Sequence, residues 1–255
     1  GLFINSFFWL VFIMLFSAGA AAEFSGIHFK GKLPALSVLT IAAALTFPVN
    51  AYLRSVDMFN VPDSLLIAAI IIIAPTLFVI SRGEIEDFKL SVPMALFGVL
   101  WIGYLFSFNI YTYFIRIDGV HYGIQAVFLF AYLVCGNDVG AYYVGSNFGK
   151  HKMSELYSPN KTWEGALGGL GFAIFTSLVC HFTFAGTIPL IHTLVLALLV
   201  VITGSLGDLV ESLFKRSSLV KDSGGILPGH GGIMDRADSI IFASPAFFWY
   251  LHYMV

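Results

Sequence analysis

Charged residues are scarce in this chain. Asp, Glu, Lys and Arg make up 11% of its 255 residues, whereas 58% of the residues are hydrophobic. An ordinary soluble domain carries about twice that share of charge, so the composition excludes that class and indicates an integral membrane protein. Segments of about ten residues with alternating polarity are also missing, which argues against a transmembrane β-barrel. The sequence shows no convincing internal repeat or low-complexity tract.

The sequence has only two cysteines and lacks three common catalytic motifs. The two cysteines, Cys135 and Cys180, fall inside apolar stretches and are predicted to be small core residues rather than a disulfide or a thiolate metal site. The sequence contains no G-x-x-x-x-G-K-[ST], because Gly145 and Gly149-Lys150 have the wrong spacing. Neither G-x-S-x-G nor H-E-x-x-H occurs, so a serine-hydrolase elbow and a zincin are not indicated.

Eight apolar stretches have the length of membrane spans: 2–22, 34–52, 63–81, 89–108, 121–145, 163–184, 188–213 and 239–254. The first stretch lacks a basic start and is too long for the core of a signal peptide. The predicted fold is therefore all-α and polytopic, with about eight transmembrane helices in a single membrane domain over 1–255. Residues 1–120 are chemically bland and are predicted to be scaffold, whereas 121–255 are predicted to carry the site.

The basic residues predict the orientation of the chain. Of the 13 lysines and arginines, only Arg54 and Arg116 fall outside the loops that follow the first, third, fifth and seventh stretches. The rule that positive loops are cytoplasmic then places the site on the cytoplasmic side of a cell (inner) membrane. It also places both termini outside, and we expect a further helix upstream of Gly1.

Most of the unusual chemistry lies in one segment, 212–238, with the sequence SLFKRSSLVKDSGGILPGHGGIMDRAD. Its charged and phosphate-binding candidates are Lys215, Arg216, Lys221, Asp222, His230, Gly231, Gly232, Asp235, Arg236 and Asp238. So many polar groups beside a membrane favour a site for phosphate and metal, because glycine amides can surround phosphate and His230 can donate to it. The alternative is a solvated connecting loop.

Residues 204–216 overlap the start of this segment and are predicted to be helical. Asp208, Glu211 and Lys215 then share one helical face. Carboxylate oxygens on one face suit Mg²⁺. The alternative is a Glu211–Lys215 pair with Asp208 bonded to a neighbouring helix, which explains Asp208 less well.

Two upstream segments add polar groups to apolar helices. Asp138 is a carboxylate within a span, which is a functional candidate, although Asn137 or a tyrosine could satisfy it instead. Thr162 is predicted to cap a helix that starts near Trp163, with Glu164 in its first turn. That helix start offers N–H groups to an anion beside Lys161, or is an ordinary capped entry helix.

The long pattern S-x-x-K-R-x4-K-D-x-G-x2-L-P-x-H-G-G-x2-D-R-x-D, from Ser212 to Asp238, resembles the motif of the phosphatidate cytidylyltransferases, or CDP-diacylglycerol synthases. The resemblance covers about the last 120 residues, with Ala237 where the family usually has a larger apolar residue. Upstream residues that also resemble the family are Asp138, Ser158-Pro159, Lys161-Thr162-Trp163-Glu164-Gly165, Gly207-Asp208 and Glu211-Ser212.

The resemblance implies that CTP and phosphatidate react to give CDP-diacylglycerol and pyrophosphate, with Mg²⁺ and in some cases a second, monovalent cation such as K⁺. It implies Asp208 and Asp235 as metal ligands with Asp238 as a further one, and Lys221 and Asp222 beside them as catalytic residues. The implied substrate-binding residues are Asp138, Ser158, Lys161, Thr162, Glu164, Glu211, Ser212, Lys215, Arg216, His230, Gly231, Gly232 and Arg236.

The expected partners are these two substrates and the lipid bilayer, with no nucleic acid, and the resemblance admits a homodimer. Three other functions remain open at this point. A CTP-dependent polyprenol-type kinase or another lipid cytidylyltransferase would use similar chemistry. An ion-coupled transporter could use Asp138 and Asp208, but it should show paired, interrupted helices in two matching halves, which the sequence lacks.

Overall fold

The computed structural model describes the whole chain except residues 1, 30, 118, 155–157, 221 and 225–230, and the side chains of 2–4, 154, 158 and 159 also lie outside the description. The chain divides into two compact units. The first comprises Gly1–Tyr111 and Ser217–Ala237, and the second comprises Thr112–Arg216 and Asp238–Val255. The prediction of a single domain, with scaffold over 1–120 and the site over 121–255, stays a prediction.

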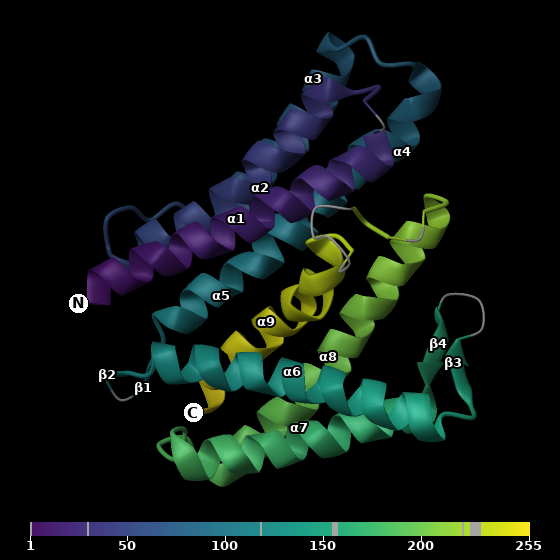
Figure 1. The fold of residues 1–255 in the computed structure, drawn as a ribbon. Coiled ribbons are helices and arrows are strands. Elements are labelled where there is room, and N and C mark those ends of the chain that lie inside the picture. The colour runs from purple at the N-terminus through teal and green to yellow at the C-terminus, as the bar shows by residue number, and fades with distance from the viewer. Residues whose placement is uncertain (1, 30, 118, 155–157, 221, 225–230) are drawn as a thin grey trace. The chain divides into compact units, whose positions relative to one another are not determined.

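The first unit is built from consecutive helices: α1 (Leu2–Phe29), α2 (Pro34–Ser55), α3 (Asp63–Ile80), α4 (Ile85–Gly98), the π-helix η1 (Val99–Leu105) and most of α5 (Phe106–Tyr113). Helices α1 and α2 lie side by side (Figure 1). Two glycines permit close packing: a Cβ on Gly103 would lie 2.7 Å from the Ala44 Cα, and one on Gly98 would lie 2.5 Å from the Phe24 ring. The aromatic rings of Phe24 and Trp101 meet edge to face in this core.

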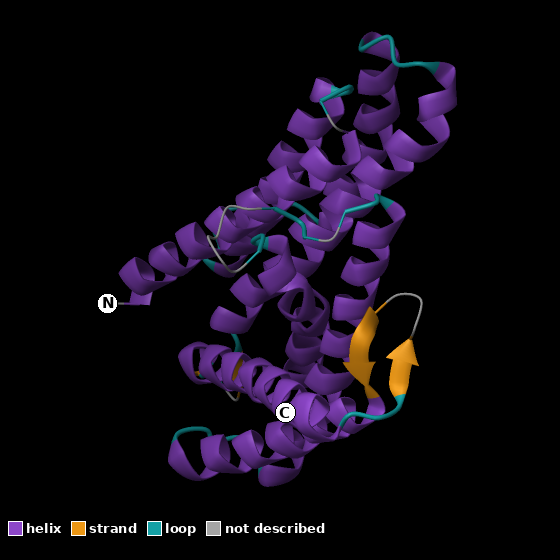
Figure 2. Ribbon diagram, turned by 45° about the vertical axis from the view of Figure 1, so that its right-hand side comes forward, coloured by secondary structure: helices purple, strands orange, loops and turns teal. Residues whose placement is uncertain are grey.

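The second unit contains two short antiparallel hairpins and four helices. The elements are β1 (Arg116–Ile117), β2 (Val120–His121), α6 (Gly123–Phe148), β3 (Lys152–Ser154), β4 (Ser158–Thr162), α7 (Trp163–Thr183), α8 (Leu190–Ser217) and most of α9 (Met234–Met254). Helices α6 and α7 run side by side, joined by the β3–β4 hairpin, which is orange in Figure 2. A Cβ on Gly140 would lie 2.6 Å from the carbonyl oxygen of Gly168, so glycine lets these two helices approach closely.

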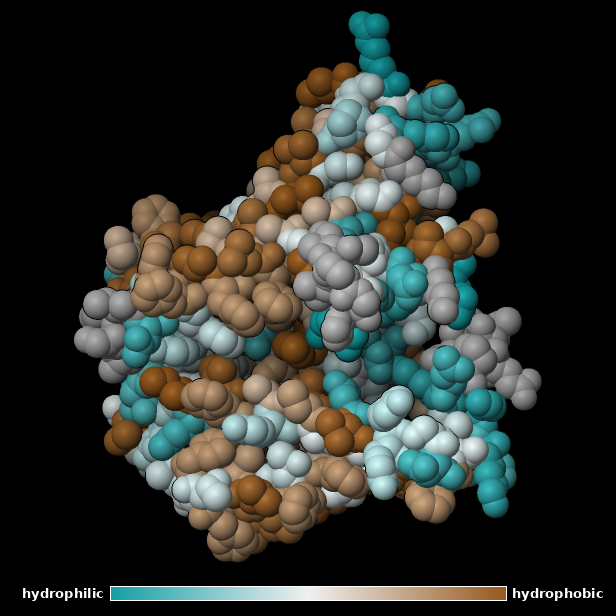
Figure 3. Space-filling view, in the orientation of Figure 1, coloured by the Kyte–Doolittle hydropathy of each residue, from teal (hydrophilic) through white to brown (hydrophobic). Residues whose placement is uncertain are grey.

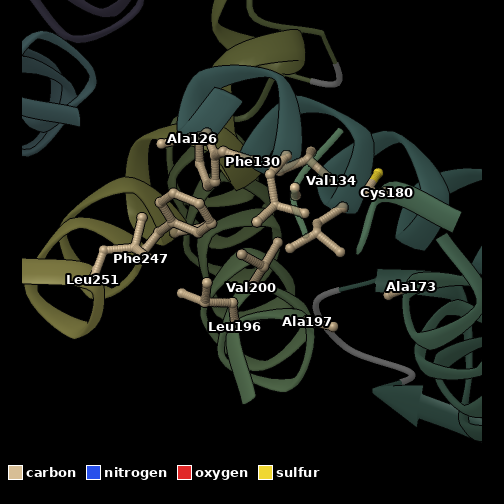
Figure 4. Close-up of a cluster of buried hydrophobic side chains, with 14 of the residues drawn as sticks. Ala126, Phe130, Val134, Ala173, Cys180, Leu196, Ala197, Val200, Phe247 and Leu251 are labelled. Atoms are coloured by element: carbon tan, nitrogen blue, oxygen red, sulfur yellow. The ribbon is translucent and has the colours of Figure 1, made fainter. Parts of the chain in front are cut away.

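All four helices of the second unit contribute to its hydrophobic core (Figure 4). The rings of Phe130 on α6 and Phe247 on α9 lie 4.9 Å apart between their centroids. Cys180 is buried in this core, as predicted, but Cys135 is exposed on α6, so its assignment to the core was wrong. Cys135 is exposed because it lies beside, and not on, the stripe of α6 that carries Phe130 and Val134 into the core.

Seven helices in the described part of the chain are long and apolar enough to cross a membrane: Asn5–Phe29, Pro34–Ser55, Asp63–Ile80, Ile85–Tyr113, Gly123–Phe148, Trp163–Thr183 and Leu190–Ser217. The eighth predicted span, 239–254, forms most of α9, which is not among the seven and whose first turn is polar. Much of the surface of α7 is hydrophobic, whereas hydrophilic residues gather at the β3–β4 hairpin (Figure 3). The prediction of an all-α polytopic membrane protein is confirmed.

Candidate functional site

A glycine brings two carboxyl groups of the second unit together. A Cβ on Gly207 of α8 would lie 2.5 Å from the carbonyl oxygen of Asp238 and 2.8 Å from the Phe242 Cβ, both on α9. Only a residue without a side chain lets the two helices pack at this distance. As a result Asp208, the next residue on α8, forms a hydrogen bond with the side chain of Asp238.

Two lysines accompany these carboxyl groups. The Nζ of Lys161, at the end of β4, lies 2.5 Å from Oδ2 of Asp208. One turn further along α8, the Nζ of Lys215 lies 2.8 Å from Oε2 of the buried Glu211. The i,i+4 pair considered for Glu211 and Lys215 is therefore present. Asp208 is bonded to Asp238 on the neighbouring helix α9, as the same alternative stated, and also to Lys161.

The contact between Asp208 and Asp238 has an electrostatic consequence. Asp238 is only 4% exposed, and its Oδ1 accepts a hydrogen bond from the backbone N–H of Ser239. Burial, followed by the neighbouring Asp208 and Glu211, raises the pKa of Asp238 well above its usual range. The side chain of Asp208, in contrast, is 37% exposed. Two carboxyl groups in contact cannot both stay charged unless a cation offsets them, and Lys161 supplies one positive charge beside Asp208. The pair is therefore a chemically unusual point in the molecule.

Thr162 and Glu164 organise the turn that presents Lys161. The Thr162 hydroxyl accepts a hydrogen bond of 3.1 Å from the backbone N–H of Gly165, which confirms the predicted cap of α7. Glu164 accepts hydrogen bonds from the backbone N–H groups of Lys150 and His151, both 3.1 Å long at Oε2. These contacts tie the end of α6 to the start of α7. The substrate-binding roles predicted for Thr162 and Glu164 stay predictions.

Asp138 lies on α6 and is exposed. Its Oδ1 accepts a hydrogen bond of 3.2 Å from the side-chain amide of Asn137, which is the local partner considered for it above. The structure therefore gives Asp138 a neighbouring donor, and its predicted role in substrate binding stays a prediction.

In the first unit, Asp235 folds the end of segment 212–238. Its Oδ2 accepts hydrogen bonds from the backbone N–H groups of Ser223, at 3.1 Å, and Gly232, at 2.8 Å. Gly231 has a φ of +79°, and a Cβ there would lie 2.8 Å from the same oxygen. The turn therefore requires glycine at this position. Asp235 thus joins Ser223 to Gly232. Its predicted role as a metal ligand stays a prediction.

The structure adds one carboxylate that the sequence argument missed. Glu23 of α1 is 7% exposed, and it accepts hydrogen bonds from Ser223, Ile233 and Met234, 200 or more residues along the chain. The predicted first span ended at residue 22, which placed Glu23 in a loop, whereas α1 continues to Phe29. A single carboxylate within an apolar helix would have been the signal.

The structure describes only some of the remaining predicted site residues. Lys221 and His230 lie outside the described residues, as does the side chain of Ser158. Asp222, Arg216 and Arg236 are exposed, and Ser212 is half-buried. In the part of the chain that is described, no group of three or more His, Cys, Asp or Glu side chains is arranged to hold a metal ion. Asp208 and Asp238 belong to the second unit and Asp235 to the first.

Comparison with known proteins gives a consistent result. The family model described as "Cytidylyltransferase family" matches residues 1–254. The phosphatidate cytidylyltransferase of Bacillus subtilis is 33% identical over 244 residues, which cover 94% of this chain and 87% of that protein. The protein of the same name from Staphylococcus saprophyticus is 42% identical over 175 residues, 68% of this chain and 65% of that protein. The one from Staphylococcus aureus strain COL is 40% identical over 174 residues, with the same shares covered.

Proposed function

Because the chain belongs to the cytidylyltransferase family, we propose that it is a nucleotidyltransferase that makes CDP-diacylglycerol and pyrophosphate from CTP and phosphatidate. An oxygen of the lipid phosphate attacks the α-phosphorus of CTP, the bond between that phosphorus and the bridging oxygen to the β-phosphate breaks, and pyrophosphate leaves. The product is an intermediate of phospholipid biosynthesis.

The reaction places particular demands on the protein. The lipid phosphate is already an anion at neutral pH, so the attack does not need a strong general base. Two polyanions must instead be brought together in line, and the charge on the departing pyrophosphate must be offset. Cationic side chains and a means of neutralising phosphate oxygens are therefore the chemistry to look for.

The second unit contains such groups. Lys161 and Lys215 lie beside the carboxyl groups of Asp208 and Glu211. In the proposal, Lys161 and Lys215 exchange part of these contacts for phosphate oxygens when substrates bind. Arg216 and Arg236 are exposed and suited to the outer phosphates. Lys221 is assigned to the nucleotide phosphates on the resemblance alone.

The donor set also fits a divalent cation. Asp208 and Asp238 place carboxyl groups in contact, which needs a positive charge or a proton, and carboxylate oxygens are the ligands that Mg²⁺ prefers. We assign Asp208 and Asp238, both in the second unit, as the residues that would hold it, and the ligand role of Asp235 stays a prediction. When bound, the ion would neutralise phosphate charge near the reacting phosphorus. The monovalent second cation stays a prediction.

We also propose that the protein lies in a membrane and that its site is on one particular face of that membrane. The apolar helices indicate a bilayer, which would retain the diacyl tails of both lipids while the head group reacts at its surface. The uneven distribution of lysine and arginine favours the cytoplasmic face of the cell membrane for the site. A homodimer stays a prediction.

The observation that carries the proposal is the contact between Asp208 and the buried Asp238, with Lys161 beside it, in a chain that matches the family over 1–254. The test uses the full chain in detergent micelles with CTP, phosphatidate and Mg²⁺, and follows pyrophosphate and the lipid product together. We expect equal amounts of pyrophosphate and CDP-lipid, loss of both with EDTA, and recovery with Mg²⁺. Release of CDP with a newly phosphorylated lipid alcohol would overturn the proposal.

A further inference from the structure

Glu23 is the only acidic residue in α1, whose other residues are nearly all apolar. The helix is long and apolar enough to cross a membrane, and the Glu23 side chain is buried within the protein. A carboxylate in such a place costs several kcal/mol unless protein donors replace its lost hydration. Its partners therefore indicate what the residue is for.

Those partners all come from the segment around the start of α9. The Oε1 of Glu23 accepts a hydrogen bond of 3.0 Å from the backbone N–H of Ile233. Its Oε2 accepts one of 2.9 Å from the N–H of Met234 and one of 3.0 Å from the Ser223 hydroxyl. The N–H groups at a helix start have no partner within the helix and favour a negative charge, so Glu23 satisfies the start of α9.

Asp235 binds the same segment. Its side chain accepts from the N–H groups of Ser223 and Gly232, while Glu23 accepts from the Ser223 hydroxyl. Ser223 is thus held by two carboxylates at once. The two ends of 223–233 are fixed to each other and to α1, and we call this arrangement the Glu23–Asp235 clamp.

Two glycines leave the room that the clamp needs. A Cβ on Gly224 or on Gly232 would overlap the Glu23 carboxylate, and one on Gly232 would also overlap the Ser223 hydroxyl. Gly224 and Gly232 therefore have a specific role, because they admit a carboxylate from a distant helix.

We propose that Glu23 is a positioning residue for CTP, which acts through the clamp and does not touch the substrate. The clamped residues are directly followed by Arg236, which the proposed function places at the outer phosphates. Holding Ser223 and the start of α9 together fixes where the side chain of Arg236 begins. This inference rests on the proposed function for its substrate, but the clamp itself is a property of the chain.

The test uses Glu23→Gln in the full chain, purified in detergent. Gln has the same shape but one carbonyl oxygen and no charge, so it cannot accept all three hydrogen bonds. We expect about a tenfold rise in the KM for CTP, with an unchanged KM for phosphatidate, measured below the unfolding temperature. Hydrogen exchange should be about tenfold faster in peptides that cover 222–236 and unchanged in α6 and α7. Ser25→Ala, on the same helix and also buried, is the matched control and should equal the wild type.

If Glu23→Gln does not fold, Ser223→Ala is the second variant. It removes only one hydrogen bond of the clamp, and we expect it to raise the KM for CTP about threefold. A lower unfolding temperature for either variant with an unchanged KM for CTP in the folded protein would overturn the positioning role. Unchanged exchange over 222–236 would overturn the clamp. If the wild type makes no CDP-lipid, the proposed function fails, and the exchange experiment still decides on the clamp.

Discussion

Two groups of carboxylates in this molecule differ in what surrounds them. Glu23 and Asp235, in the first unit, accept hydrogen bonds from backbone N–H groups and a hydroxyl. Asp208 and Asp238, in the second unit, contact each other, with Lys161 on one side. A carboxylate that is surrounded by protein donors stabilises a fold, whereas two carboxyl groups in contact, with one lysine beside them, can take up a further cation or a proton.

This difference separates a structural role from a catalytic role. Loss of Glu23 or Asp235 should loosen the segment they hold, and the effect of losing Glu23 on catalysis should be indirect. Loss of Asp208 or Asp238 should leave the fold in place and remove the chemistry. Relieving the repulsion between two acidic groups can even stabilise the protein, as often happens at functional sites.

The largest expected effect is that of Asp208→Asn. The amide keeps the size of the side chain but removes its charge, so we expect kcat to fall by about 10²–10³-fold, the usual cost of losing one electrostatic group at a reacting centre. The unfolding temperature should not fall. Glu86→Gln, at an exposed carboxylate in α4, is the control for a lost charge. Wild-type kcat in Asp208→Asn would remove the pair from the chemistry.

Lys161→Met should have the next largest effect. The substitution retains the apolar stem but removes the charge that lies 2.5 Å from Asp208. Hydrogen bonds between charged groups contribute about 1.5–3 kcal/mol, so we expect kcat/KM to fall by about 10–100-fold. Lys152→Met changes an exposed lysine in the other strand of the same hairpin and should retain full activity. Equal losses in the two variants would indicate a general effect of surface charge.

Gly207→Ala tests the helix contact that creates the pair. The added Cβ would lie 2.5 Å from the carbonyl oxygen of Asp238, so α8 and α9 must separate. We expect a loss of about 1–3 kcal/mol in the free energy of unfolding and a loss of activity together. In Gly204→Ala, one turn earlier, the nearest atom to the Cβ is 3.5 Å away, which is ordinary contact. That variant should be close to the wild type, and similar behaviour of the two would refute the packing argument.

Thr162→Val should have the smallest effect. It removes the hydroxyl that caps α7, which costs about 1 kcal/mol of stability, so the unfolding temperature should fall by a few degrees. Thr162→Ser retains the hydroxyl and should restore most of that loss. A fall in activity much larger than the loss of folded protein would instead support the substrate contact predicted for Thr162.

The sequence was a good guide wherever the signal was local. Apolar length predicted the helices, and the cap at Thr162 and the Glu211–Lys215 pair followed from helix geometry. Contacts between distant segments were not predictable in this way. The bond between Asp208 and Asp238 depends on how α8 and α9 pack, and the partners of Glu23 are 200 or more residues away in the sequence. The predicted end of the first span at residue 22 also left Glu23 outside the apolar helix. Its unusual position, as a carboxylate within α1, was therefore missed.

Binding of Mn²⁺, as a spectroscopic substitute for Mg²⁺, tests the central distinction most directly. Electron paramagnetic resonance of the purified chain without nucleotide should show a bound ion that Mg²⁺ displaces. Asp208→Asn and Asp238→Asn should each weaken that binding at least tenfold, because each removes a charged oxygen ligand, and Glu23→Gln should leave it unchanged. Undiminished binding in Asp238→Asn, or its loss in Glu23→Gln, would contradict the assignment of the two carboxylate groups to different roles.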